Sequence, residues 1–160
     1  MSLDITAMRK LRKVENPILD ENGYPEDYEN KWKPGASMEW SEEKFPGRGE
    51  GIDANSVYEF EEEYSFRAGS YSDYGAWRDE LDKFKGDVAF QELINFADNE
   101  GVIGSVVAKK LLADFEKYEN EAEDYSKNVE NSDGEWFIYK YKQWKKAMEL
   151  ASDRGAVDFH

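Results

Sequence analysis

The sequence predicts an α+β protein in which a small antiparallel sheet packs against about four helices. Two periodicities predict this class. Apolar residues alternate over residues 57–67, as in a strand with one wet face, and recur at helical spacing in four later segments. The third observation is the number of large rings, because 9 Phe, 10 Tyr and 5 Trp can fill a hydrophobic core. Since 160 residues is the length of one ordinary domain, we expect residues 1–160 to fold as a single domain.

The first half of the chain is expected to supply the sheet and an irregular acidic excursion. Residues 3–14 begin with an extended segment, and residues 57–67 place four aromatic side chains on one face: Tyr58, Phe60, Tyr64 and Phe66. Glu62 interrupts this apolar row, so we expect it to pair with a cation such as an N-terminal arginine. The excursion, at about residues 15–56, contains turn-forming residues and has no clean period.

The second half is expected to form helices near residues 73–85, 89–99, 105–124 and 135–152. Ser72 or Asp73 is a suitable N-cap for the first of them. The last has an apolar stripe, consisting of Phe137, Tyr141, Trp144 and Met148. Its opposite side carries lysines that we expect to face water or an acidic part of the same chain, namely Lys140, Lys142, Lys145 and Lys146. The tail "GAVDFH" alternates and is expected to return as a short edge strand.

Composition excludes several kinds of site. The absence of cysteine excludes disulfides, thiolate zinc sites and a cysteine nucleophile. The one histidine is His160, at the end of the sequence, which argues against a serine triad with an internal histidine base. No apolar run approaches the ~20 residues that span a bilayer, and the basic start is not followed by a signal-peptide core. We therefore expect a cytoplasmic protein with no membrane association, no metal site and no cofactor.

The net charge of −15 is concentrated in the first half, where residues 15–63 carry fifteen acidic and four basic side chains. Such a field repels phosphates and attracts basic protein surfaces, or serves only solubility. We therefore expect a protein partner and no direct binding of nucleic acid. The acidic face expected to meet that partner is the wet side of the strand at 57–67, with Glu59, Glu61 and Glu63.

A candidate binding site is predicted where turns and chain ends meet at the rim of a helix-over-sheet fold. The stretch "FRAGSYSDYGAWRDEL" at residues 66–81 is a strand-to-helix corner, and other candidates lie in a helix-to-helix loop and at the chain end. The predicted binding residues are Arg67, Ser70, Tyr71, Asp98, Glu100 and His160. Together they suit a small polar ligand or the anchoring side chain of a partner. The alternative is that they only cap helices and pair with one another.

Several segments resemble a family of small uncharacterised proteins encoded by tailed bacteriophages and prophages. They are "LDITA", "FPGR", "FRAGSYSDYGAWRDEL", "FQELINFADNEGVIG" and "GAVDFH". The resemblance covers both ends and the middle of the chain, and it implies a phage origin, with the host cytoplasm as location, but no reaction. Asn99 stands where the family pattern has cysteine, so the resemblance implies no thiol chemistry here.

The function that these observations favour is that of a phage-type accessory protein, a non-catalytic protein-binding module. One alternative is an acidic mimic of nucleic acid that inhibits a DNA-binding host protein. Another is a carboxylate-dependent, Mg²⁺-type enzyme, because paired carboxylates hold Mg²⁺ or act as acid and base. The candidate acids for such an enzyme are Asp98 with Glu100, and Asp158 beside His160.

Overall fold

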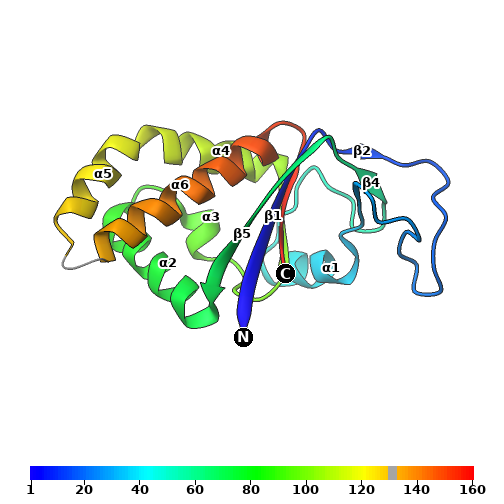
Figure 1. Ribbon diagram of the computed structural model, residues 1–160, viewed down its shortest axis with the longest axis horizontal. Coiled ribbons are helices and arrows are strands. Elements are labelled where there is room, and N and C mark those ends of the chain that lie inside the picture. The colour runs from blue at the N-terminus through cyan, green and yellow to red at the C-terminus, as the bar shows by residue number, and fades with distance from the viewer. Residues whose placement is uncertain (130–132) are drawn as a thin grey trace.

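The computed structural model describes residues 1–129 and 133–160 and shows an α+β fold, as predicted (Figure 1). The larger sheet has the strand order β5-β1-β7-β6, and every neighbouring pair is antiparallel. Its strands are β1 (Ser2–Arg9), β5 (Glu62–Ser70), β6 (Gly101–Gly104) and β7 (Ala156–Phe159). The smaller sheet has the order β2-β4-β3, with β2 (Arg12–Lys13), β3 (Lys31–Trp32) and β4 (Tyr58–Glu59).

The two predicted strands are present, but each is divided between the two sheets. The extended segment is interrupted between β4 and β5, which belong to different sheets. The four aromatic side chains predicted to share one face therefore do not all share it. Phe66 packs on Trp144 with ring centroids 5.1 Å apart, whereas Tyr58 lies 6.0 Å from the ring of Trp32 in the smaller sheet. The predicted partner of Glu62 is confirmed, since Arg9 Nη1 lies 3.3 Å from its carboxylate.

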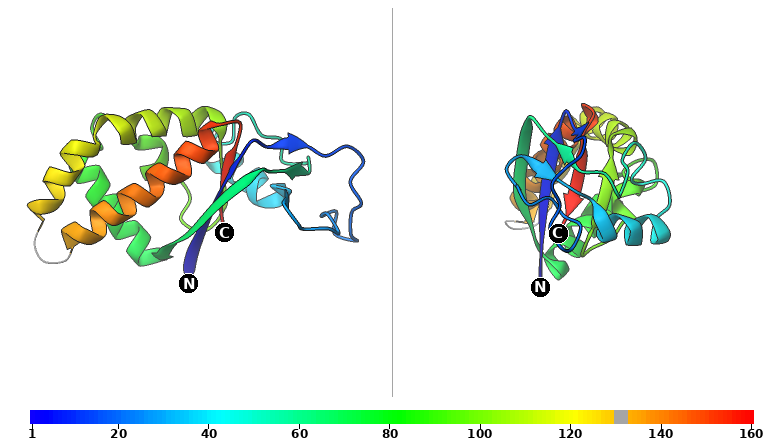
Figure 2. Two further views of the ribbon diagram at one scale, coloured as in Figure 1. Left: turned by 45° about the horizontal axis from the view of Figure 1, so that its top comes forward. Right: turned by 90° about the vertical axis from the view of Figure 1, so that its right-hand side faces the viewer.

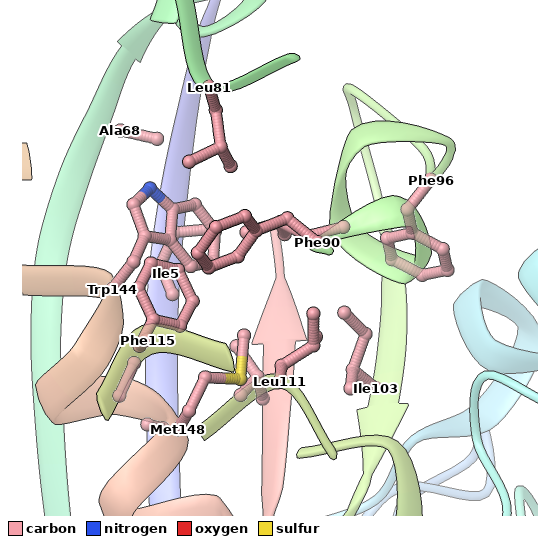
Figure 3. Close-up of a cluster of buried hydrophobic side chains, with 14 of the residues drawn as sticks. Ile5, Ala68, Leu81, Phe90, Phe96, Ile103, Leu111, Phe115, Trp144 and Met148 are labelled. Atoms are coloured by element: carbon pink, nitrogen blue, oxygen red, sulfur yellow. The ribbon is translucent and has the colours of Figure 1, made fainter. Parts of the chain in front are cut away.

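Helices cover one face of the larger sheet, and the excursion projects from the opposite end of the molecule (Figures 1 and 2). The helices are α1 (Gly35–Lys44), α2 (Tyr71–Lys85), α3 (Gln91–Ile94), α4 (Ser105–Lys117), α5 (Glu119–Lys127) and α6 (Asp133–Ser152). Figure 3 shows the core that α2, α4 and α6 share with the sheet. The predicted apolar stripe of α6 is confirmed, because all four of its side chains are completely buried. Two of its four lysines pair with acidic residues as expected, Lys145 with Glu119 at 2.6 Å and Lys142 with Glu123 at 3.1 Å. Lys140 instead donates to the Arg67 carbonyl, and Lys146 lies over the ring of Tyr64.

Three helix predictions were wrong in extent. The helix expected at 89–99 is only the four-residue α3, because Phe90 precedes it in the left-handed conformation (φ 65°) and Asn95 ends it. The helix expected at 105–124 is two helices that meet at Tyr118. The N-cap of α2 is Ser70 rather than Ser72 or Asp73, since Ser70 Oγ accepts a hydrogen bond from the Asp73 amide at 3.0 Å.

Three further differences concern elements that tertiary contacts determine. Helix α1 lies inside the excursion that was expected to be irregular, and it packs on β6 through Met38 and Ser41. Strand β6 was not predicted, because all four of its residues are buried and none alternates with a wet neighbour. Strand β7 is present as predicted, but it is a central strand between β1 and β6 and not an edge strand. Among the described residues, no helix is long and apolar enough to cross a bilayer.

Candidate binding cleft on the open face of the sheet

The larger sheet has one covered face and one open face, and β7 shows the difference. Val157 and Phe159 are fully buried in the helical core, whereas Asp158 between them points to the opposite side. Thr6 of β1 and Val102 of β6 lie directly opposite Asp158 in the strand register. The open face therefore places a carboxylate and a hydroxyl side by side in its middle.

The excursion covers only part of this open face. A small apolar cluster of Met38, Val102 and Ala156 lies under α1, with Trp32 and Ile52 packed against it. The uncovered remainder forms a cleft with two adjacent lobes, both opening next to Trp32. The cleft exists because the excursion covers only one part of the open face and leaves the rest uncovered.

The two lobes have volumes of about 510 Å³ and 540 Å³, within the range of ligand pockets. The first, here called the Tyr71 lobe, is lined by Trp32, Lys33, Pro34, Ser37, Tyr71, Asn99, Glu100, Asp158, Phe159 and His160. The second, here called the Glu63 lobe, is lined by Thr6, Met8, Tyr28, Glu29, Asn30, Lys31, Trp32, Phe60, Glu63, Asp158 and His160. The lobes share Trp32, Asp158 and His160, which form the centre of the cleft.

Hydrogen bonds fix the polar floor of the cleft. The Thr6 hydroxyl lies 2.9 Å from His160 Nε2 and 3.1 Å from the Ser65 hydroxyl, so these contacts join β1, β5 and the residue that follows β7. The backbones of His160 and Asp4 also bond to each other. The imidazole of His160 is therefore held in place at the junction of the two lobes.

Asp158 has an unusual electrostatic environment. Burial raises the pKa of its carboxyl group to about 7, and repulsion by Glu100 acts in the same direction. The neighbouring Trp32 side chain acts to lower this pKa, but its effect does not offset the desolvation. A carboxyl group that titrates near neutral pH inside a cleft is typical of functional sites.

The cleft is strongly acidic because its carboxylates have no ion-pair partners in the described part of the chain. Each salt bridge found there involves other acids, so the four cleft carboxylates stay uncompensated: Glu29, Glu63, Glu100 and Asp158. The two lysines of the cleft are engaged elsewhere. Lys31 lies 3.4 Å from Asp27, and Lys33 donates to the Gly23 carbonyl at 2.6 Å and lies over the ring of Tyr24. The cleft therefore favours a cationic ligand.

The structure brings together three of the six predicted binding residues. Tyr71, Glu100 and His160 line the Tyr71 lobe. The other three do not line the cleft: Ser70 caps α2, Arg67 is exposed on β5 and Asp98 is exposed before β6.

The predicted acidic face is divided. Glu59 lies 2.8 Å from Arg12, and Glu61 lies 3.8 Å from Lys10, so the N-terminal bases neutralise both carboxylates. Glu63, the third member, points into the Glu63 lobe and has no such partner among the described residues. The uncompensated negative charge therefore lies in the cleft rather than along the whole strand.

The residues of the Tyr71 lobe that sequence reasoning missed include Trp32, Ser37 and Asn99. Trp32 stands between two lysines in a segment without periodicity, and Ser37 belongs to the unpredicted α1. Asn99 was noted only as a departure from a cysteine pattern. The one local signal was the position of Asn99 beside Glu100 in a loop ending at a glycine.

The glycine-rich loop at residues 47–51 does not serve as an anion site. The amides of Gly47 and Gly49 donate hydrogen bonds to the carboxylate of Glu42, at 3.1 Å in the case of Gly47. Backbone amides arranged in this way bind anions in other proteins, but here the chain supplies its own carboxylate from α1. The loop therefore anchors the excursion.

Comparison of this chain with protein-family models, with curated protein sequences and with solved structures finds no significant match. The residues that the structure describes contain no group of three or more His, Asp or Glu side chains with a geometry suited to a metal ion. Function is therefore inferred from the chemistry of the cleft itself.

Proposed function

We propose that this protein is a non-catalytic protein-binding module that receives a basic partner in the two-lobed cleft. The observation that supports this proposal is the set of four cleft carboxyl groups without ion-pair partners in the described residues. Of the two cleft lysines, Lys31 is paired with Asp27 and Lys33 donates to the Gly23 carbonyl. Uncompensated charge in a concave, partly desolvated site costs stability, and a partner's cation would relieve that cost. The phage origin, and with it the host cytoplasm as location, stays a prediction.

The competing proposal of a nucleic-acid mimic needs a continuous acidic surface that imitates a row of phosphates. The pairing of Glu59 with Arg12 and of Glu61 with Lys10 interrupts such a row along β4 and β5. The unpaired carboxyl groups inside the cleft suit a projecting basic side chain better than a broad DNA-binding groove. For the magnesium enzyme, no cluster of ligands in the described residues offers support.

The proposal is tested by removing charge from the cleft without changing its shape. In the cleft variant, Glu63→Gln, Glu100→Gln and Asp158→Asn remove up to three negative charges. A matched control, Asp79→Asn with Asp87→Asn and Glu116→Gln, removes three charges from exposed positions on the helical side. Both variants and the wild type are immobilised at pH 8, where Asp158 is charged, and used to capture proteins from a bacterial lysate.

We expect the wild type and the control variant to retain the same basic protein in 150 mM salt, and the cleft variant to lose it. Salt at this concentration screens the general field of the protein over about 8 Å, so a contact made inside the cleft survives better than a long-range attraction. If both variants lose the captured protein equally, capture depends only on the net charge of the protein and not on the cleft. Retention by the cleft variant would refute the cleft as the binding surface.

A further inference from the structure

The residues that line the Tyr71 lobe include two with a buried polar atom that lacks a hydrogen-bond partner among the described residues. Ser37 Oγ and Asn99 Oδ1 are buried atoms without a hydrogen-bond partner in the described part of the protein. The carboxylates of Glu100 and Asp158 line the same lobe and have no ion pair there. Buried polar atoms are normally satisfied, because leaving a hydrogen bond unmade in the interior is unfavourable. The lobe is therefore complementary to a group that carries several donors.

Two aromatic rings complete the lobe. Trp32 and Asp158 line the same lobe, and Tyr71, the first residue of α2, lines it as well. Aromatic faces attract cations, and a planar guanidinium also stacks on them, whereas an ammonium is a compact and strongly hydrated charge. We infer that the Tyr71 lobe is a binding site for a guanidinium group, in particular the arginine side chain of a protein partner.

This inference rests on the proposed binding function and names the group that the cleft recognises. The acceptors come from three separate segments: Ser37 from α1, Asn99 and Glu100 from the turn before β6, and Asp158 from β7. A guanidinium carries five N–H donors in one plane, so it can reach acceptors on several sides at once. The three donors of an ammonium radiate from one atom, and they match such a spread of acceptors less well.

No cation of the chain already fills this role in the described structure. Lys33, at the edge of the lobe, is bonded to the Gly23 carbonyl and lies 5.2 Å from the centre of the Tyr24 ring. His160 is oriented by Thr6, 2.9 Å away, and faces both lobes. The lobe volume of about 510 Å³ leaves room for a guanidinium and the aliphatic stem behind it.

The test is a nuclear magnetic resonance titration of ¹⁵N-labelled protein at pH 8 in 150 mM salt. The probes are N-acetyl-arginine amide, which represents a partner's side chain, methylguanidinium, which represents a free small molecule, and N-acetyl-lysine amide. The indole N–H signal of Trp32 is the readout, because this side chain lines the lobe together with Asp158. We expect both guanidinium probes to shift it saturably, and the lysine probe to bind at least fivefold more weakly.

Substitutions then test whether the residues of the Tyr71 lobe bind the guanidinium probes. Asp158→Asn should weaken the binding of blocked arginine at least tenfold, while the exposed Asp79→Asn, which removes the same charge, should leave it unchanged. Asn99→Ala removes an acceptor that has no partner in the described protein, so it should weaken binding several-fold without affecting folding. Tighter binding of blocked arginine than of methylguanidinium supports a side chain of a partner, and the reverse order supports a small guanidine.

The guanidinium assignment is overturned if the Trp32 signal does not saturate with either probe, if the lysine probe binds as tightly, or if Asp158→Asn behaves like Asp79→Asn. These results can be separated from failure of the proposed function. If blocked arginine does not bind but the cleft variant still loses the captured partner, the cleft contacts the partner through another chemistry. If blocked arginine binds but no partner depends on the cleft, the site serves a small ligand.

Discussion

Replacing Asp158 with asparagine should change how the stability of the protein depends on pH. Burial raises the pKa of the carboxyl group from 3.8 to about 7 in the folded state, whereas the unfolded chain has the ordinary value. Between these pH values the folded protein keeps a proton that the unfolded chain has released. The contribution of this group to the free energy of unfolding therefore falls as pH rises from about 4 to about 8.

The size of the effect follows from the raised pKa. At about 1.4 kcal/mol for each pH unit, the wild type should lose about 4 kcal/mol of stability through this group between pH 4 and pH 8. Asparagine has nearly the same shape as aspartate and does not titrate. The variant should therefore equal the wild type at low pH and exceed its free energy of unfolding by about 4 kcal/mol at pH 8.

The measurement is urea unfolding of the wild type, Asp158→Asn and the exposed control Asp87→Asn at several pH values from 4.5 to 8.5. The difference between variant and wild type cancels the titration of all the other carboxylates. The Asp87→Asn curve should run parallel to that of the wild type. If the Asp158→Asn curve is also parallel, the carboxyl group is not desolvated and the electrostatic argument for the cleft is wrong.

Two further predictions concern the packing that positions the cleft. Trp144→Ala should lower the free energy of unfolding by about 3–5 kcal/mol, because it empties a completely buried site, whereas Tyr139→Ala on the exposed side of α6 should change it little; urea unfolding midpoints test both. Gly104→Ala should cost about 1–3 kcal/mol, because a β-carbon there would collide with the Glu50 carbonyl oxygen. Gly75→Ala, in an α2 position with open space, should instead stabilise the protein by about 0.5–1 kcal/mol, so thermal unfolding should show shifts of opposite sign.

The parts of the fold that could be predicted are those whose pattern is set by contact with water. The apolar stripe of α6 and the alternation along β1 and β5 arise because one side of each element is wet. Strand β6 gave no such signal, because both of its faces are covered. Helix α1 was missed because it has little amphipathic pattern of its own, and its place depends on β6, whose Val102 amide donates to the buried Ser41 hydroxyl.

The residues of the candidate site also separate into those that a local sequence pattern could indicate and those that only tertiary contacts bring to the cleft. Tyr71, Glu100 and His160 could be proposed from the sequence because each is polar and stands in a turn or at the end of an element. Trp32 and Ser37 could not, because they reach the cleft only when the excursion packs on the open face of the sheet. No spacing within the sequence records a contact between segments that lie more than 100 residues apart.

The acidic excursion therefore builds the cleft in addition to carrying charge. Trp32 packs against the small apolar cluster over β6 and β7, and the same side chain lines the cleft together with Asp158. A cation bound beside Asp158 would favour its charged form, and the Trp32 side chain acts on the pKa of Asp158 in the same direction. Binding of the cation and docking of the excursion should then reinforce each other, since both favour the charged form of Asp158.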